Sequence, residues 1–411
     1  MRVALETKVN LFDAAKQGDV ATVVAAQLTR AEADILDAQR MTPLAWATLG
    51  GHVEVVDALL GFGANPNRKF KSRTLLGFAA ESGSVETVKR VLEAGVDRRV
   101  TELDQWTPVH RAARHGHAAV LELLLSKGFP ADAPAKGKRT PLTLACQSGH
   151  LEAARVLLDA RAKVNHRVVH QHGGDCPLTL AAASGSRATV ELLLDRGARI
   201  DLTNGTALTS LAIAIARDHA EVFDLLVARG ADLNAHGDHG APPVVIAATH
   251  GRTDLLERLL DAGVSPDQPT ALRGRRPLMA AVGGGHGEAA ELLLSRGAVV
   301  DQTDGQYGDT ALCHAVAARR PAMVTLLLGA GAEVNHRNQG GRTPLFYLLA
   351  GTFHTYAHYG TVTTDPEPVV RALLAGGAEL GAQDTAGHSV LELAREHQHA
   401  DVVAALEACA D

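Results

Sequence analysis

The chain has 411 residues, of which 46% are hydrophobic, 21% charged and 3% aromatic, and its formal net charge is −6. This composition is ordinary for a soluble globular protein, and the scarcity of aromatic residues predicts a core of small residues in thin layers. No apolar run reaches the roughly 18 residues that a membrane-spanning helix needs. The first residues, MRVALETKVNLFDAAKQGD, mix acids and bases where a signal peptide has an apolar core.

The four cysteines, Cys146, Cys176, Cys313 and Cys409, lie far apart in the chain. Their spacing matches neither a disulfide framework nor a zinc site. We therefore expect a protein of the reducing cytoplasm without a metal, a cofactor or a membrane anchor, and secretion as an effector stays open.

Short segments of similar sequence recur along the chain. The segment TPVHRAARHGH, from Thr107, returns as MTPLAWATLGGH from Met41, RTPLTLACQSGH from Arg139, RRPLMAAVGGGH from Arg275 and GRTPLFYLLAG from Gly341. With the Thr of TPL as a register mark, successive marks lie 33, 32, 33, 33, 36, 33, 33, 34, 34, 33 and 46 residues apart. About twelve repeats therefore cover nearly the whole chain. The marks are Val9, Thr42, Thr74, Thr107, Thr140, Cys176, Thr209, Pro242, Arg276, Thr310, Thr343 and Ser389.

Each repeat predicts two short helices and a polar turn. Thr at the mark can cap the first helix by accepting an orphan N–H, and the Pro beside it fits the first helical position. The second helix carries a richer apolar stripe, as from Val53 to Leu60. A glycine 21 residues after the mark suits the positive φ that ends this helix, and the turn-rich segment after it should project as a hairpin-like finger. These glycines are Gly63, Gly95, Gly128, Gly197, Gly230, Gly263, Gly297 and Gly331.

A repeat of this length cannot bury its own apolar stripe, so its stability must come from its neighbours. The pattern resembles the ankyrin repeat, whose signature T-P-L-H-x-A recurs with a period of about 33 residues. The resemblance implies an all-α ankyrin-repeat solenoid over residues 1–411. We expect an N-terminal capping repeat in residues 1–36, internal repeats in 37–380 with insertions near 166–175 and 351–364, and a C-terminal capping repeat in 381–411.

In ankyrin repeats the His of TPLH and the His of the later GH are framework positions, here His110 and His117. A residue that the repeat register explains needs no catalytic role, so we interpret these histidines as structural. Arg114 and His115 lie seven and eight residues after the mark, where the family exposes variable side chains. The GH position also holds His52, His150, His219, His286 and His399.

The resemblance also implies partner-contact positions four, three and one residues before each mark, and seven and eight after it. Trp, Tyr and Arg are the residue types most often found at interface hot spots. The alternative is that each is a solvated loop residue. The candidates are Phe70, Lys71, Arg73, Asp104, Trp106, Arg114, His115, Lys136, Arg139, His239, Arg273, Arg275, Tyr307, Asp309 and Arg342.

Charge is unevenly distributed. Residues 1–170 have a balance of +5 and residues 171–411 a balance of −11. Neighbouring fingers should bring the positive excess into one strip that steers an acidic segment of a partner protein. Nucleic acid is a weaker hypothesis, because the chain is acidic and no aromatic ladder accompanies the basic residues. The strip consists of Arg68, Lys69, Lys71, Arg73, Arg98, Arg99, Lys136, Lys138 and Arg139.

Two insertions interrupt the period. The first enlarges one finger into NHRVVHQHGGDC, residues 165–176, whose His and Cys side chains are possible ligands for a transition metal. An alternative function is therefore a metal- or small-molecule-responsive sensor built on residues 166–176. The second insertion, near 351–364, carries Tyr356 and Tyr359. These aromatic residues could contact a partner, form the lid of an enzyme, or fold back on the last repeats.

The sequence contains no motif of a known catalytic site. GGGHGE at Gly283 lacks the Lys of a phosphate loop, and no G-x-S-x-G elbow is present. We therefore predict a monomeric, non-catalytic scaffold or adaptor that binds another protein through its inner face and finger tips. The fold alone does not identify the partner.

Overall fold

The computed structural model describes residues 11–70, 73–99, 101–168, 174–235, 241–349 and 365–409. The described chain is built of short helices and contains no strand, only two isolated β-bridges. It divides into two compact blocks, an N-terminal block of residues 1–205 and a C-terminal block of residues 206–411. The all-α prediction is confirmed, whereas a single continuous solenoid over the whole chain stays a prediction.

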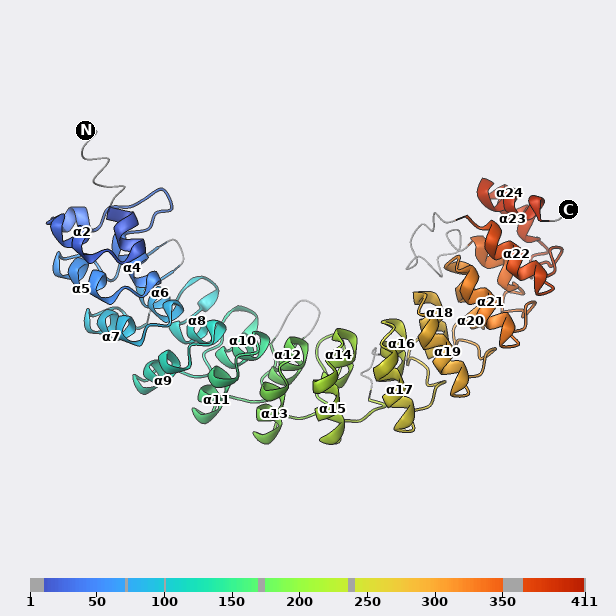
Figure 1. Ribbon diagram of the computed structural model, residues 1–411, viewed down its shortest axis with the longest axis horizontal. Coiled ribbons are helices and arrows are strands. Elements are labelled where there is room, and N and C mark those ends of the chain that lie inside the picture. The colour runs from blue at the N-terminus through green and yellow to red at the C-terminus, as the bar shows by residue number, and fades with distance from the viewer. Residues whose placement is uncertain are drawn as a thin grey trace. The chain divides into compact units, whose positions relative to one another are not determined.

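In the N-terminal block, first helices α4, α6, α8, α10 and α12 lie in one row on the side of the fingers. Second helices α5, α7, α9, α11 and α13 lie in an outer row (Figure 1). Residues 11–17 are also helical. The elements are α2 (Val20–Ala25), α3 (Arg30–Ala33), α4 (Pro43–Gly50), α5 (Val53–Gly61), α6 (Leu75–Ser82), α7 (Val85–Glu93), η1 (Leu103–Gln105), α8 (Pro108–His115), α9 (Ala118–Ser126), η2 (Lys136–Lys138), α10 (Pro141–Gln147), α11 (Leu151–Asp159), α12 (Pro177–Ser184) and α13 (Arg187–Asp195).

The C-terminal block repeats the helix pairs with one exception: after Thr343 the first helix is a 3₁₀ helix, η3. This helix leads into residues 350–364, so the insertion with Tyr356 and Tyr359 lies outside the described residues. The elements are α14 (Ser210–Arg217), α15 (Ala220–Ala228), α16 (Pro243–Thr249), α17 (Thr253–Asp261), α18 (Pro277–Gly284), α19 (Gly287–Ser295), α20 (Ala311–Ala317), α21 (Pro321–Gly329), η3 (Pro344–Leu349), α22 (Glu367–Ala375), α23 (Val390–Glu396) and α24 (Ala400–Ala408).

The register marks begin the first helices as expected. The hydroxyl oxygens of Thr42, Thr74 and Thr140 accept hydrogen bonds from the backbone N–H three residues later, at 3.1, 3.0 and 3.4 Å. The eight glycines predicted to end the second helices have φ between 77° and 89°. One repeat has Arg161 there, with φ 63°. The repeat signature therefore specifies where each helix begins and ends.

Neighbouring repeats stack through thin layers of small residues. Helix α6 packs against α4 and α8, and α18 packs against α16 and α20. Ala45, Ala79 and Ala280 are fully buried between these layers. Because each helix pair buries its apolar face against its neighbours, the stability of a repeat depends on the repeats beside it. Within the described ranges, every helix is too short or too polar to cross a membrane.

Four of the GH histidines, His52, His117, His150 and His286, join their repeat to the one before it. Their Nε2 atoms lie within hydrogen-bond distance of the carbonyl oxygen seven residues after the preceding mark. Where the position holds Arg252, its Nη2 donates to the equivalent carbonyl of Ala216 at 3.4 Å. These side chains therefore have the framework role that the register predicts. The histidine contacts are His52 to Lys16 (2.9 Å), His117 to Glu81 (2.9 Å), His150 to Arg114 (3.1 Å) and His286 to Thr249 (3.0 Å).

Candidate partner-binding surface

The candidate contact residues divide by their exposure to solvent. Lys71, His239, Tyr356 and Tyr359 lie outside the described residues. Phe70, Trp106 and Asp309 are buried. The other candidates are exposed (Asp104, Arg114, His115, Lys136, Arg273 and Tyr307) or half-buried (Arg73, Arg139, Arg275 and Arg342).

The expectation of exposed aromatic side chains is wrong for Phe70 and Trp106, which are 4% and 8% exposed. The Phe70 ring packs edge-on against Phe78, with ring centroids 5.5 Å apart. Trp106 belongs to a buried cluster with Ala135 and Leu144 of the following repeat. Small core residues leave room beneath a finger, and a large ring that turns inward removes its apolar surface from water. Both residues therefore support their fingers from inside.

Asp309 is also buried, where an exposed contact was expected. Its carboxylate accepts hydrogen bonds from the side-chain amide of Asn338, at 2.8 Å, and from the hydroxyl of Tyr347. Burial raises the pKa of Tyr347, so this hydroxyl keeps its proton and can donate it. Asp309 thus joins its own finger to the next finger and to η3.

Arg73 was predicted to contribute a free charge to the basic strip, but its guanidinium is paired within the fold. It forms an ion pair with Glu81 and lies over the Phe78 ring, 4.2 Å from the centroid. Its side chain is only 28% exposed. Arg73 therefore stabilises the finger and offers little charge to a partner.

Glu102, which the sequence analysis did not single out, is a buried carboxylate with a side chain 1% exposed. It accepts a hydrogen bond from the backbone N–H of Thr74 at 3.1 Å. It also receives the Nε and Nη2 of Arg111, at 2.8 and 2.7 Å. Helix α6, its neighbour α8 and the finger between them are thus connected through the carboxylate of Glu102.

Gly77 makes room for this carboxylate, because it stands where the ankyrin signature has His. A Cβ atom added at Gly77 would lie 1.8 Å from Glu102 Oε1. In the next repeat the signature histidine, His110, fills the same place. The Thr107 N–H donates to His110 Nδ1 at 3.1 Å, and His110 Nε2 lies 3.3 Å from the carbonyl oxygen of Arg139. Glu102 therefore substitutes for a framework histidine.

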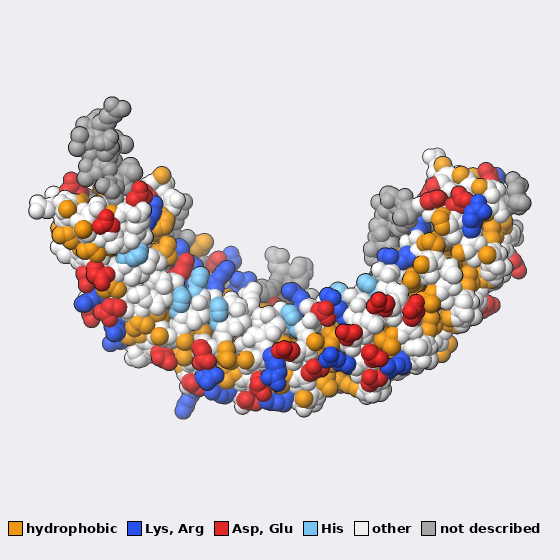
Figure 2. All heavy atoms as spheres, in the orientation of Figure 1, with side chains coloured by type: hydrophobic (Ala, Val, Ile, Leu, Met, Phe, Trp, Pro, Cys, Tyr) orange, Lys and Arg blue, Asp and Glu red, His pale blue; other side chains and the backbone are white. Residues whose placement is uncertain are grey.

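Several finger cations of the N-terminal block have no ionic partner. Arg98, Arg99 and Lys138 are exposed and Arg139 is half-buried. Within the described ranges, none of these four lies within 4.0 Å of a carboxylate. Figure 2 shows Lys and Arg side chains gathered on the finger side of this block, whereas basic and acidic side chains alternate on its outer helices. The fingers therefore carry a net positive surface.

The finger tips of the two blocks are connected differently. In the C-terminal block, backbone N–H groups donate to the neighbouring finger from Gly305 to Arg273 (3.2 Å), from Gln339 to Tyr307 (3.0 Å) and from Thr385 to Gly340 (3.0 Å). In the N-terminal block, fingers 102–106 and 135–139 are fully described and share no backbone hydrogen bond. One exposed ion pair joins them, between Lys136 and Asp104 at 3.3 Å. Fingers 102–106 and 135–139 are therefore less tightly connected at their tips than these fingers of the C-terminal block.

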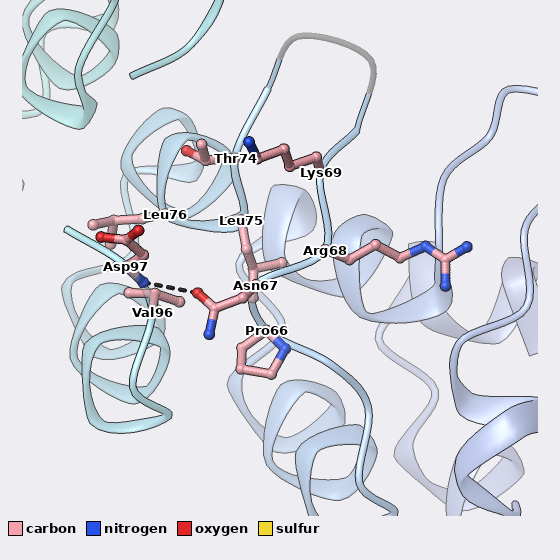
Figure 3. A pocket seen from close by; sticks show the side chains of 9 residues that line it. All are labelled: Pro66, Asn67, Arg68, Lys69, Thr74, Leu75, Leu76, Val96 and Asp97. Atoms are coloured by element: carbon pink, nitrogen blue, oxygen red, sulfur yellow. Dashed lines mark hydrogen bonds between the residues drawn. The ribbon is translucent and has the colours of Figure 1, made fainter. Parts of the chain in front are cut away.

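The bases of the fingers are joined by asparagine side chains that the sequence analysis also missed. Asn67 Oδ1 accepts the backbone N–H of Asp97 at 2.8 Å, beside a hollow of about 180 Å³ (Figure 3). Asn67 Nδ2 donates to the carbonyl of Gly95 at 3.1 Å. Asn165, three repeats further along the chain, makes the equivalent two contacts with Gly197 and Arg199. The hollow is therefore a junction between repeats, and it is smaller than the ~300 Å³ of a typical small-molecule site.

The metal interpretation of residues 166–176 is not tested, because residues 169–173 lie outside the described ranges. Of the possible ligands that are described, His166 Nε2 lies 2.6 Å from the carbonyl oxygen of Lys138, and Cys176 is buried. Elsewhere in the described ranges, no three His, Cys, Asp or Glu side chains are grouped so that they could hold a metal ion.

The described helix pairs, with their charged side chains on projecting fingers, define a repeat protein that presents a solvent-facing surface. The chain belongs to the ankyrin-repeat family. A family model described as "Ankyrin repeats (3 copies)" matches residues 11–102, 76–168, 166–237 and 244–338. This confirms the family that the T-P-L-H-x-A pattern indicated. Ankyrin repeats are in general modules of protein–protein interaction.

The chain is similar to parts of longer ankyrin proteins. It is 28% identical over 272 residues to ankyrin repeat and KH domain-containing protein mask-1 of Caenorhabditis elegans, covering 64% of this chain and 10% of that protein. It is 35% identical over 133 residues to human transient receptor potential cation channel subfamily A member 1, covering 31% and 12%. The chain thus spans about a tenth of these relatives. The crystal structure of the human ASB11 ankyrin repeat domain is 30% identical and covers 54% of this chain and 98% of that domain, with a TM-score of 0.47.

Proposed function

We propose that this chain is a non-catalytic, monomeric adaptor that holds an acidic segment of a partner protein on the fingers of its N-terminal block. The observation that carries the proposal is a set of cations on neighbouring fingers that have no ion-pair partner among the described residues: Arg98, Arg99, Lys138 and Arg139. An acidic segment bound on the fingers would supply negative charges to pair with these cations.

The local charge also favours the fingers of this block over its outer helices as the docking surface. Outer-helix cations such as Arg90 and Arg196 are paired across repeats, with Asp57 at 3.5 Å and Asp159 at 2.9 Å. Finger cations with no such partner attract an acidic segment at longer range and raise its rate of association. This attraction acts over about 8–10 Å at physiological salt, so binding should weaken as salt is added.

The test is a comparison of two charge-reversed chains in capturing proteins from the extract of the source cell. The finger variant replaces Arg98, Arg99, Lys138 and Arg139 with Glu. The matched control makes the same change in net charge at four exposed cations at or beside the outer helices: Lys127, Arg155, Arg161 and Arg187. Arg155 and Arg187 form only solvent-exposed ion pairs within their own helices, which contribute little to stability.

We expect the control to capture the same partner as the unmodified chain and the finger variant to lose it, with closely similar melting temperatures for all three. Arg73 is left unchanged, because replacing it would break its ion pair with Glu81 and lower the stability of the finger. A loss of binding could then not be assigned to the lost charge alone. Capture of the same partner by the finger variant would contradict the proposal.

A further inference from the structure

Trp106 holds two guanidinium groups over its indole ring, and only one of them has ionic partners. The Cζ atoms of Arg111 and Arg114 lie 4.7 and 5.5 Å from the ring centroid. Arg111 forms ion pairs with the carboxylates of Glu102 and Glu81, at 2.7 and 3.6 Å. Arg114 is exposed, and in the described chain no carboxylate lies within ion-pair distance of it.

This arrangement leaves Arg114 ready to bind an anion. A cation–π contact uses the face of the guanidinium plane and leaves the N–H donors at its edge available. These donors match the two oxygen atoms of a carboxylate. Because the indole already restricts the Arg114 side chain, less conformational entropy is lost when a carboxylate binds.

A second guanidinium without an ion-pair partner among the described residues belongs to Arg139, in the neighbouring finger. The backbone carbonyl of Arg139 lies 3.3 Å from His110 Nε2, and the His110 ring stacks on Trp106 with centroids 5.9 Å apart. Arg139 is half-buried and has no carboxylate within ion-pair distance in the described chain. The backbone of Arg139, in the next finger, thus lies against the His110 ring that stacks on Trp106, and Arg114 lies over the same indole from α8.

We infer that Trp106, Arg114 and Arg139 form a seat for one carboxylate, which receives a Glu or Asp side chain of the acidic segment. This inference rests on the proposed function and names the residues that bind a carboxylate of the acidic segment. The tips on either side are open to an incoming chain, since fingers 102–106 and 135–139 share no backbone hydrogen bond. Leu103, 67% exposed, offers an apolar contact beside the seat.

The test measures the binding of a six-glutamate peptide by isothermal titration calorimetry at low salt. The diagnostic variant is Arg114→Lys, which keeps the positive charge but loses the planar pair of donors. The matched control is Arg155→Lys on α11, an equally conservative change at an exposed arginine. We expect Arg114→Lys to bind the peptide about tenfold more weakly, the effect of losing one charge-assisted hydrogen bond, and Arg155→Lys to bind it like the unmodified chain.

A second readout follows the indole directly. The chain has two tryptophans, so a Trp46→Phe background leaves Trp106 as the reporter. We expect the peptide to change Trp106 emission, and a six-glutamine peptide to leave it unchanged. Unaltered Trp106 emission on saturation with the six-glutamate peptide would overturn the seat.

The outcomes separate the seat from the proposed function. If Arg114→Lys binds the peptide like the unmodified chain while the four-residue finger variant does not bind, the seat is overturned and the basic fingers remain the docking surface. If the unmodified chain does not bind the peptide, the seat is overturned, and the extract capture described above decides the proposed function by itself.

Discussion

His110 makes the stability of the N-terminal block sensitive to acid, and replacing it with threonine should remove that sensitivity. Burial, with a smaller contribution from the charge of Arg111, lowers the pKa of His110 from the usual 6.5 to about 4. Its Nδ1 accepts the Thr107 N–H, so Nε2 carries the proton toward Arg139. Protonation of Nδ1 would remove this acceptor. Threonine is the natural alternative, since Thr143 holds the same register position and accepts the equivalent N–H at 3.0 Å.

The magnitude follows from the two pKa values. Below pH 6.5 the unfolded chain binds a proton at this histidine, whereas the folded chain resists protonation until about pH 4. The histidine therefore reduces stability as the pH falls through this window, by about 2 kcal/mol between pH 7 and pH 5 and about 3 kcal/mol by pH 4. Other groups titrate as well, but they titrate equally in both chains.

The assay is urea unfolding followed by the emission of Trp106, whose ring stacks on His110, in the Trp46→Phe background. We compare the unmodified His110 with His110→Thr at pH 7 and at pH 5. The chain with His110 should lose about 2 kcal/mol more of its unfolding free energy than the variant over this interval. An equal loss in both chains would show that His110 is not held neutral by burial.

Two further substitutions test the buried carboxylates. Gly77→Ala should lower the free energy of unfolding in urea by about 3–5 kcal/mol, because the new Cβ displaces Glu102 from Arg111. The control is Gly61→Ala, which has nothing within 4 Å of the added Cβ and should raise the free energy of unfolding by up to about 1 kcal/mol. Equal effects of the two substitutions would contradict the role of Gly77. Tyr347→Phe should lower the unfolding free energy of the C-terminal block by about 1–3 kcal/mol, because a buried acceptor loses its donor, and an unchanged midpoint would contradict the role of that hydroxyl.

The repeat signature predicted the parts of the fold that recur. Thr42 and Thr74 cap their helices, and Gly63 and Gly95 end the second helices at positive φ. These positions are predictable because each meets the same local requirement in every repeat. The mark must supply an acceptor for the unpaired N–H groups at the start of a helix, and the end of the second helix needs a residue that adopts positive φ without a steric clash of its Cβ. The family comparison confirms the fold class that they indicated.

The orientation of finger side chains was not predictable from the register alone. Phe70 and Leu103 both lie four residues before a mark, yet they are 4% and 67% exposed. Whether such a residue turns inward depends on the space left by the neighbouring repeat, which the sequence of one repeat does not reveal. Sequence reasoning therefore located the fingers and assigned too many of their side chains to the surface.

The missed residues did leave signals in the sequence. Gly77 replaces the signature His in the segment TLLG, and a repeat without that His needs another acceptor for the N–H of its mark. Glu102, in the finger that follows, supplies it. Asn67 and Asn165 each lie four residues after the residue that ends the second helix, Gly63 and Arg161, a position fixed enough to suggest a link between repeats.

Site-specific photo-cross-linking in the source cell can show whether a partner protein lies on the fingers of the N-terminal block. A photoreactive amino acid is placed either at Lys138, an exposed position on a finger, or at Arg155, an exposed position on outer helix α11. We expect a cross-linked partner from position 138 and none from position 155. A partner cross-linked only from position 155 would contradict this expectation.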